Sequence, residues 1–403
     1  MHMKTSTKMT LGAVLWTAMI LHPSTLIAQG SLTPPGAPAP TMKTLQQVEP
    51  RVPISSAPFT ITQPGSYYLT TNLTLSGGDA ITIATSGVTL DLNGFTISST
   101  ANPASGTAIL LSDALKNVAI LNGHIQGSVT NDGSGNFNGP GFGYGISYYS
   151  SAPLNMRVSG VSVSGCLFSA INVDYFWGST TVENCVVQAV GSYGIVASTI
   201  RGCLASDCGL YAIWGSQVSD SFGKSVGSGT GLSAITAHNC YGISSTGYGL
   251  YAYNAQNCYG GSSGSIGLYA VRTAIGCYGS SDNNIGLYAT TAQNCYGESS
   301  NSYGLYATTA QNCYGRSISD IGLRAFTAQN CYGFSDSDTG LYAAYTAIGC
   351  YGYSNSGSRG LYAQNANTCT GYRPGGRAIE ASIANGCWAA SGTNLISFKY
   401  NMP

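Results

Sequence analysis

The sequence predicts an all-β solenoid, in which short parallel strands wind into coils and each coil stacks on the one before. Three observations lead to this prediction: a repeat of 18 or 19 residues, an alternation of side-chain character with a period of two, and an unusual composition. Charged residues make up 7% of the 403 residues, whereas glycine contributes 54 and tyrosine 28. The glycine content and the lack of helical spacing over any ten residues argue against helical repeats.

The first 28 residues have the pattern of an export signal. Lys4 and Lys8 precede an apolar stretch, and the segment TLIAQG offers a cleavage site after Ala28. The stretch is shorter than the ~20 apolar residues that a membrane-spanning helix needs, so a membrane anchor is the less favoured alternative. We therefore expect a signal peptide over 1–28, a protein that is secreted or held at the cell surface, and no membrane span after cleavage. The Pro-rich segment 29–54 is expected to be an extended linker.

A cysteine marks each repeat, and one serine takes its place. The positions are Cys166, Cys185, Cys203, Ser221, Cys240, Cys258, Cys277, Cys295, Cys313, Cys331, Cys350, Cys369 and Cys387. An aliphatic residue precedes each of the later positions by 8 or 9 residues, from Ile195 through Leu305 to Ile379. Within the recurring GLYA, Leu and Ala alternate with Tyr, which is typical of a strand with one buried face. The aliphatic and cysteine positions are therefore expected to face the core.

The residue before the cysteine position is Asn or Gly in every repeat except two, where it is Asp220 and Thr368. Asn and Gly share a tolerance of positive φ, so this position is expected to be a left-handed bend between two strands. Asn side chains that stack from coil to coil can also hydrogen-bond with one another.

Several segments resemble the opening coils of right-handed parallel β-helix proteins with the pectin-lyase-like architecture. They are FTITQPGSYYLTTNLTL, ITIATSGVTLDLNGFTI and NVAILNGHIQG, and the Asn-Cys bends are similar to the asparagine ladder of that group. The resemblance implies a right-handed parallel β-helix over 55–403 and implies little about activity. We expect longer irregular coils over 55–180, regular short coils over 181–390, and a C-terminal cap over 391–403.

A left-handed β-helix is the rival fold, because its coil also has 18 residues. It would need an aliphatic residue every six positions, but the sixth residue after Leu287 is Gln293 and the twelfth is Ser299.

The 13 cysteines of an exported chain would ordinarily suggest disulfides. Stacked coils keep equivalent Cβ atoms about 4.8 Å apart, whereas a disulfide needs about 3.8 Å, so buried free thiols are expected instead. A row of thiols does not form a tetrahedral site and no C-x-x-C motif exists, so no metal or other cofactor is expected. Cys208 lies outside the repeat and is expected near the surface.

Two columns of tyrosines are expected on the outside of the solenoid, one after the aliphatic position and one after the cysteine position. The second column includes Tyr278, Tyr296 and Tyr314. Stacked rings stabilise neighbouring strands by ~0.2–1 kcal/mol per pair, so one interpretation is purely structural. The other is a platform for sugars, in which these three tyrosines bind the ligand.

The repeat is broken between residues 127 and 179. Loops on neighbouring coils are expected to bring together Asp132, Tyr144, Asp174, Tyr175, Phe176 and Trp177. The four aromatic residues of this group are candidate ligand-binding residues, because binding usually resides on loops. Asp132, Asp174 and Arg157 are candidate catalytic residues, because polysaccharide-cleaving chemistry needs clustered carboxylates or a carboxylate with a basic residue.

We expect a non-catalytic protein that binds a polysaccharide or cell-surface glycan, or serves as an adhesive or structural spacer, and that is a monomer. The alternative is a polysaccharide lyase or glycoside hydrolase with its site at the 127–179 loops. Two carboxylates, or a carboxylate beside Arg157, converging in one groove would favour the enzyme. The net charge of zero and the lack of Lys/Arg runs give no reason to expect nucleic acid as a partner.

Overall fold

The computed structural model describes residues 49–112, 114–174 and 178–402. The expected signal peptide over 1–28, most of the expected linker, and the candidate residues Tyr175, Phe176 and Trp177 lie outside the described residues. Every regular element of the described residues is a β-strand, and they contain no helix long and apolar enough to cross a membrane.

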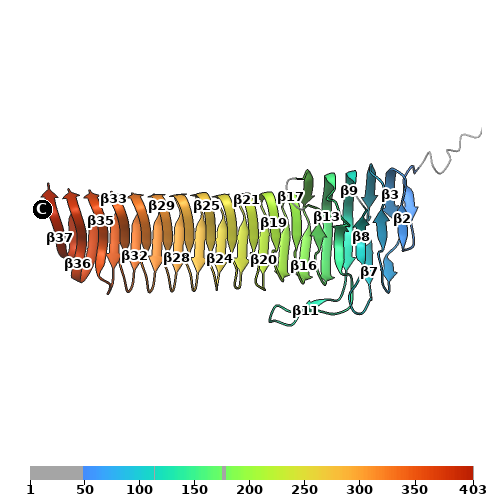
Figure 1. Cartoon of the computed structure of the whole chain (residues 1–403), viewed down its shortest axis with the longest axis horizontal. Coiled ribbons are helices and arrows are strands. Elements are labelled where there is room, and N and C mark those ends of the chain that lie inside the picture. Colours follow the sequence, from blue (N-terminus) through green and yellow to red (C-terminus); the bar gives the residue numbers. More distant parts are fainter. Residues whose placement is uncertain (1–48, 113, 175–177, 403) are drawn as a thin grey trace, which may run out of the picture. The chain divides into compact units, whose positions relative to one another are not determined.

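The strands of residues 50–403 form one parallel β-solenoid (Figure 1). Each strand pairs in parallel with the equivalent strands of the coils before and after it. For example, Leu287 pairs with Leu305, and Leu305 pairs with Leu323. The exception is an antiparallel hairpin of β10 (Thr130–Asn131) and β11 (Phe137–Asn138). The predicted all-β parallel solenoid is confirmed by this pairing.

The first coils are long and irregular. Their strands are β1 (Val52–Ile54), β2 (Phe59–Ile61), β3 (Gly65–Leu69), β4 (Leu73–Leu75), β5 (Ile81–Ile83), β6 (Val88–Asp91), β7 (Thr96–Ser99), β8 (Thr107–Leu111), β9 (Lys116–Gln126), β12 (Tyr144–Tyr148), β13 (Leu154–Cys166), β14 (Ile171–Asn172), β15 (Thr180–Glu183) and β16 (Val186–Val190). The sheet thus begins at Val52, whereas the sequence placed the first coil at residue 55.

The later coils each have one long and one short strand. They are β17 (Ile195–Arg201), β18 (Leu204–Cys208), β19 (Ile213–Ser219), β20 (Phe222–Ser225), β21 (Leu232–His238), β22 (Tyr241–Ser244), β23 (Leu250–Gln256), β24 (Tyr259–Ser262), β25 (Leu268–Ile275), β26 (Tyr278–Ser281), β27 (Leu287–Gln293), β28 (Tyr296–Ser299), β29 (Leu305–Gln311), β30 (Tyr314–Ser317), β31 (Leu323–Gln329), β32 (Tyr332–Ser335), β33 (Leu341–Ile348), β34 (Tyr351–Ser354), β35 (Arg359–Asn367), β36 (Thr370–Asn385) and β37 (Trp388–Tyr400). Such unequal sides do not match the six-residue periodicity of the left-handed alternative.

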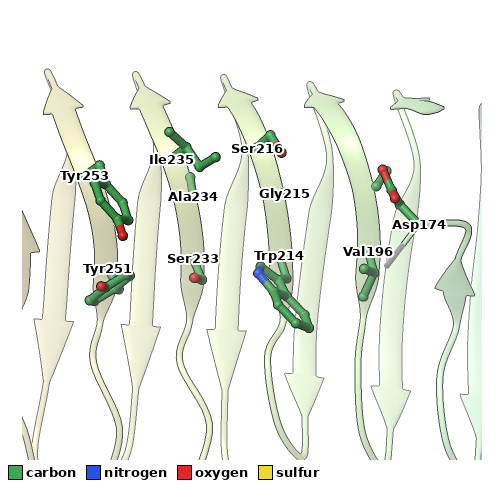
Figure 2. Close-up of a pocket in the computed structure, with 11 residues that line it drawn as sticks. Asp174, Val196, Trp214, Gly215, Ser216, Ser233, Ala234, Ile235, Tyr251 and Tyr253 are labelled. Atoms are coloured by element: carbon green, nitrogen blue, oxygen red, sulfur yellow. The ribbon is translucent and has the colours of Figure 1, made fainter. Parts of the chain in front are cut away.

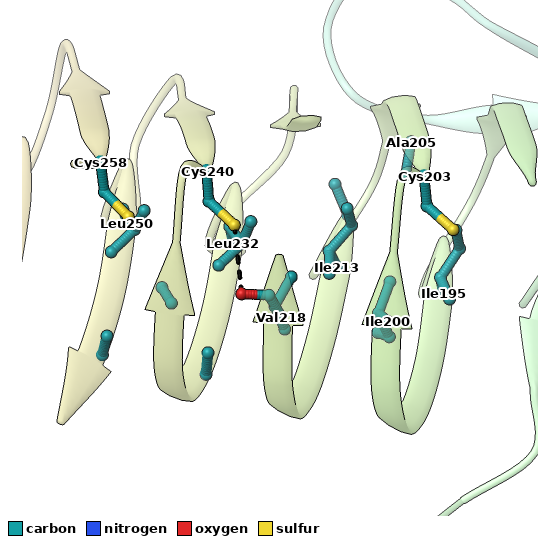
Figure 3. Packing of buried hydrophobic residues seen from close by; sticks show 14 of the residues in the cluster. Ile195, Ile200, Cys203, Ala205, Ile213, Val218, Leu232, Cys240, Leu250 and Cys258 are labelled. Atoms are coloured by element: carbon teal, nitrogen blue, oxygen red, sulfur yellow. Dashed lines mark hydrogen bonds between the residues drawn. The ribbon is translucent and has the colours of Figure 1, made fainter. Parts of the chain in front are cut away.

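The core is a narrow column filled by the aliphatic, alanine and cysteine positions of successive coils (Figure 3). Leu305 and Ala310 are fully buried and Cys313 is 3% exposed. The thiols also hydrogen-bond to backbone carbonyls, as Cys240 Sγ donates to Val218 O at 3.4 Å. The inward assignment of these three positions is confirmed.

The placement of Cys166 in the same column as Cys185 is wrong, because Cys166 pairs with Val190 and Val190 with Cys208, whereas the register puts Val161 beside Cys185.

The bends before the cysteine positions are left-handed, as predicted. Asn312 has φ of 51°, and even the exceptions Asp220 and Thr368 have φ of 51° and 50°. Asn312 Nδ2 donates to Asn294 Oδ1 at 3.2 Å, so the Asn side chains do bond along the stack. One residue type therefore both permits the bend and links one coil to the next.

All thirteen cysteines are free and buried. The expectation that Cys208 lies near the surface is wrong, because its side chain is fully buried. Asp207 adopts φ of 53°, and Cys208 then lies in register with Val190 and Ser225 of the neighbouring coils, whose side chains are also buried. Burial raises the pKa of the Cys208 thiol, which keeps it protonated at neutral pH.

Candidate functional site

Asp132 lies in the tight loop between β10 and β11. Its side chain accepts hydrogen bonds from the side chain of Asn136 at 2.9 Å and from the backbone N–H of Ser134 at 2.7 Å. These bonds, led by that from Asn136, lower the pKa of the Asp132 carboxyl. The neighbouring Asn131 donates to Asp207 at 2.7 Å, which fixes the loop to β18. The carboxylate of Asp132 therefore stabilises its own loop.

Asp174 lies elsewhere, just after β14, and is 3% exposed. Its carboxylate accepts hydrogen bonds from Thr180 Oγ1 at 3.1 Å, from the N–H of Gly178 at 3.3 Å, and from the hydroxyl of Ser198. None of the described residues that bond to Asp174 also bonds to Asp132.

Tyr144 is also remote from Asp174. Ile146 pairs with Ile171, which places Tyr144 and Asp174 five residues apart along the strand direction, or about 16 Å. The Tyr144 ring instead packs on Phe168, with centroids 5.1 Å apart. The structure therefore separates Tyr144 from Asp174 along the strand direction, and it bonds the hairpin that holds Asp132 to Asp207 of β18.

Arg157 does have a carboxylate beside it. Its Nε donates to Glu183 Oε1 at 2.7 Å across neighbouring strands β13 and β15. The Arg157 side chain is 58% exposed, and neither residue lines the pocket described next. The pair has the geometry of an exposed ion pair on the sheet surface.

A mainly apolar concavity lies on the outer face of the long strands. This pocket of about 400 Å³ crosses the coils of β17, β19, β21 and β23, and Figure 2 shows its walls. Its lining comprises Asp174, Val196, Ala197, Trp214, Gly215, Ser216, Ser233, Ala234, Ile235, Tyr251 and Tyr253. Asp174 is the one candidate from the irregular region that contributes to the described lining.

The pocket arises where the aromatic column after the aliphatic position is interrupted. Trp214 pairs with Ser233, Ser233 with Tyr251, and Tyr251 with Tyr269. Ser233 thus replaces a ring in the column and leaves a gap between Trp214 and Tyr251. Two coil spacings separate these residues, or about 9.6 Å, which is enough for one six-membered ring between two aromatic faces. We call this gap the Ser233 slot.

The aromatic rings on both sides of the Ser233 slot are supported from behind. Tyr251 stacks on Tyr269 with centroids 5.4 Å apart and planes at 10°, so its opposite face is directed toward the Ser233 coil. Trp214 packs on Tyr211 at 5.4 Å and on Tyr193 at 5.9 Å. These contacts hold the walls in place before any ligand enters.

A second interruption of the same column shows what a filled gap looks like. Arg324 stands between Tyr306 and Tyr342, and its guanidinium lies 5.5 Å and 5.6 Å from the two ring centroids. The cation occupies the place of the missing ring. The side chain of Ser233 is too short to reach both rings, and it is 9% exposed where it contributes to the lining of the pocket.

The predicted ligand-binding tyrosines of the other column form a continuous stack. Tyr296 lies 4.7 Å from Tyr278 and 4.8 Å from Tyr314, with planes within 7°. Each ring therefore covers the faces of its neighbours, and the hydroxyl of Tyr278 donates a hydrogen bond to Glu298 Oε2 at 2.9 Å. This geometry suits the structural interpretation of the column.

The sequence contains a signal for the Ser233 slot that the prediction missed. The motif GLYA at 249–252 becomes GLSA at 231–234, one repeat earlier, and AIWG precedes it at 212–215. The absence of a tyrosine at position 233 predicts a gap only if the rings of the column stack on one another. If the tyrosines formed a flat binding surface, its absence would remove one contact with the ligand and create no gap.

The described residues contain no group of three or more His, Cys, Asp and Glu side chains placed to hold a metal ion.

No family model and no curated protein matches the chain. Two solved structures are distantly similar. A polygalacturonase from Erwinia carotovora ssp. carotovora has 11% identity and a TM-score of 0.26, over 84% of this chain and 89% of that one. ORF18 of Geobacillus virus E2 has 14% identity and a TM-score of 0.20, over 85% of this chain and 53% of that one. Such low scores carry no argument, and the fold assignment rests on the strand pairing.

Proposed function

We propose that this chain is a secreted or cell-surface, non-catalytic protein that binds carbohydrate in the Ser233 slot, while its regular coils act as a spacer. The observation that supports the proposal most is the gap between Trp214 and Tyr251 in the aromatic column, which no neighbouring side chain of the column fills as Arg324 fills the other interruption. Tryptophan and tyrosine faces bind the apolar C–H faces of sugar rings, and their polar groups bind the hydroxyls.

The rest of the pocket also suits a sugar. Ser216 and Ser233 offer hydroxyl groups, and Asp174 offers carboxylate oxygens, within an otherwise apolar lining. A mainly apolar concavity with a few polar groups is the usual form of a small-molecule site. Burial and the neighbouring phenols raise the pKa of Tyr251, so its hydroxyl stays protonated and can donate a hydrogen bond at neutral pH.

A polysaccharide lyase or glycoside hydrolase remains the alternative. Glycoside hydrolysis ordinarily requires two carboxyl groups flanking the bond that is cut. Asp174 is the single carboxylate in the described lining of the pocket. This favours binding over cleavage.

The test is a glycan array on the purified protein, followed by titration of each hit and a reducing-end assay. Tyr251→Ala is expected to weaken binding at least about tenfold, because it removes one wall of the Ser233 slot. The matched control replaces Tyr278, Tyr296 and Tyr314 with Ala, and binding should persist because their faces are covered. Loss in the triple variant alone would move recognition to the other column. Release of reducing ends that Tyr251→Ala abolishes would establish the enzyme instead.

A further inference from the structure

We infer that the pocket selects short glycans without negative charge and binds them with a hydroxyl or ammonium group against Asp174. The inference rests on the proposed function and specifies its ligand class. It depends on the charges, the hydrogen bonds and the layout of the pocket, each of which is independent of the aromatic gap itself.

Asp174 is the one charged residue in the described lining, which contains no Lys, Arg or His. Three described groups donate hydrogen bonds to its side chain: Thr180 Oγ1 and the hydroxyl of Ser198 to one oxygen, and the N–H of Gly178 to the other. Asp174 therefore acts as an acceptor, and a ligand that meets it must supply a donor. A ligand carboxylate or sulfate would meet like charge with no cation in the lining to offset it.

The layout of the pocket directs a ligand from the Ser233 slot toward Asp174. Ser216 lies two residues after Trp214, and Figure 2 shows it between Ile235 and Asp174. Its small side chain leaves a second shallow place in the lining of the pocket. The two shallow places connect diagonally. Asp174 is three coil spacings from Ser233, or about 14 Å, which is longer than one sugar ring. A ligand that stacks in the slot and reaches Asp174 is therefore a short oligosaccharide.

Electrostatic repulsion in a partly enclosed pocket is large enough to select. Two like charges separated by several ångströms, at the effective dielectric of a protein surface, weaken binding by about tenfold or more. A hydroxymethyl group and a carboxylate at C6 of a sugar are of similar size. Discrimination between them in this pocket would therefore be mainly electrostatic.

The experiment titrates the full-length mature protein with the trimers of glucose, galactose and mannose and with their C6-carboxylate counterparts, together with the glucosamine trimer. At least one neutral or amino trimer should bind, and each carboxylate counterpart should bind about tenfold more weakly or worse. If no trimer of any class binds the protein, the proposed function itself fails. If a carboxylate trimer binds as tightly as its neutral counterpart, and Tyr251→Ala abolishes both, the slot is a glycan site but the inference about charge is overturned.

Two variants separate charge from folding. Asp174→Asn keeps the size of the side chain and is expected to bring the carboxylate trimer to within about threefold of the neutral one. Ser216→Arg places a cation between the Ser233 slot and Asp174 without touching the hydrogen bonds of Asp174, and it should make the carboxylate trimer the tighter ligand. If Asp174→Asn fails to fold, Ser216→Arg decides alone. An unchanged preference in folded Ser216→Arg overturns the inference.

Discussion

Leu305 and Tyr306 are neighbours in the chain but belong to opposite faces of the coil wall. Leu305 is fully buried in the core column, whereas Tyr306 lies outside and stacks on Tyr288 with centroids 5.2 Å apart. A buried leucine contributes through the water-exposed area that it loses and the cavity that its removal leaves, whereas a stacked surface ring contributes through its neighbours alone.

We predict that Leu305→Ala lowers the free energy of unfolding by about 2–5 kcal/mol, because a narrow column cannot close the cavity. Tyr306→Ala should cost well under half as much. Urea denaturation of both variants, followed by circular dichroism, measures the difference. Equal losses would mean that the inside and outside of the coil have been confused.

At the scale of the structural element, the column of cysteines is characterised by buried thiols. Its thiols are at most 3% exposed, and burial raises the pKa of Cys166, which lies beside this column, to about 12. We predict that Ellman's reagent finds almost no reactive thiol in the native protein and all 13 cysteines after denaturation without reductant. Recovery of few free thiols from the denatured chain would show disulfides and overturn the parallel-Cβ argument.

The tyrosine column after the cysteine position should set the alkaline limit of stability. Burial, and then the neighbouring phenols, raise the pKa of Tyr332 to about 12, against about 10 in an unfolded chain. Because the folded state holds the proton more tightly, this contribution is complete below pH 10 and is lost as the pH rises toward 12. Phenolate absorbance and the unfolding temperature, both followed against pH, should change together over that interval. Titration of every tyrosine near pH 10 with no loss of stability would contradict the prediction.

The sequence predicts the columns well because one repeat carries the same alternation through every coil. Cys313 is buried and Asn312 forms the bend, as their equivalents one coil away do. The spacing of 18 or 19 residues is therefore sufficient to place both residues.

Cys208 is misplaced because it belongs to a second inward column with Cys166, Val190 and Ser225, and the left-handed residues before its first three members, Gly165, Ala189 and Asp207, share no residue type that a repeat could reveal. The positions of the loops at 127–179 could not be predicted from the repeat either. They depend on contacts between residues far apart in the sequence, such as the hydrogen bond between Asn131 and Asp207, 76 residues apart.

At the scale of the whole solenoid, successive coils are interchangeable. Leu287 N donates to Gly304 O at 3.0 Å, and the equivalent bonds from Leu305 and Leu323 have the same length. Stability in such a stack is approximately a sum of coil and interface contributions, so a coil should be removable as a unit.

We predict that deletion of residues 305–322 leaves a folded protein, since Leu323 then takes the position of Leu305. The matched control deletes residues 305–313 and should disrupt the fold, because it places the four-residue strand Tyr314–Ser317 and the turn after it where a seven-residue strand must pair. Circular dichroism and thermal unfolding compare the two. Unfolding of the whole-coil deletion would show that the coils are not equivalent.

The measurement that tests the central claim most directly is carbohydrate titration of Ser233→Tyr beside Arg324→Tyr. Each variant puts a ring at one of the two interruptions of the same aromatic column, but only the first fills the Ser233 slot. We predict that Ser233→Tyr keeps or raises the unfolding temperature, because the new ring stacks between Trp214 and Tyr251, and that it weakens binding at least about tenfold. Arg324→Tyr should bind as the unmodified protein does. Undiminished binding by folded Ser233→Tyr would contradict the account.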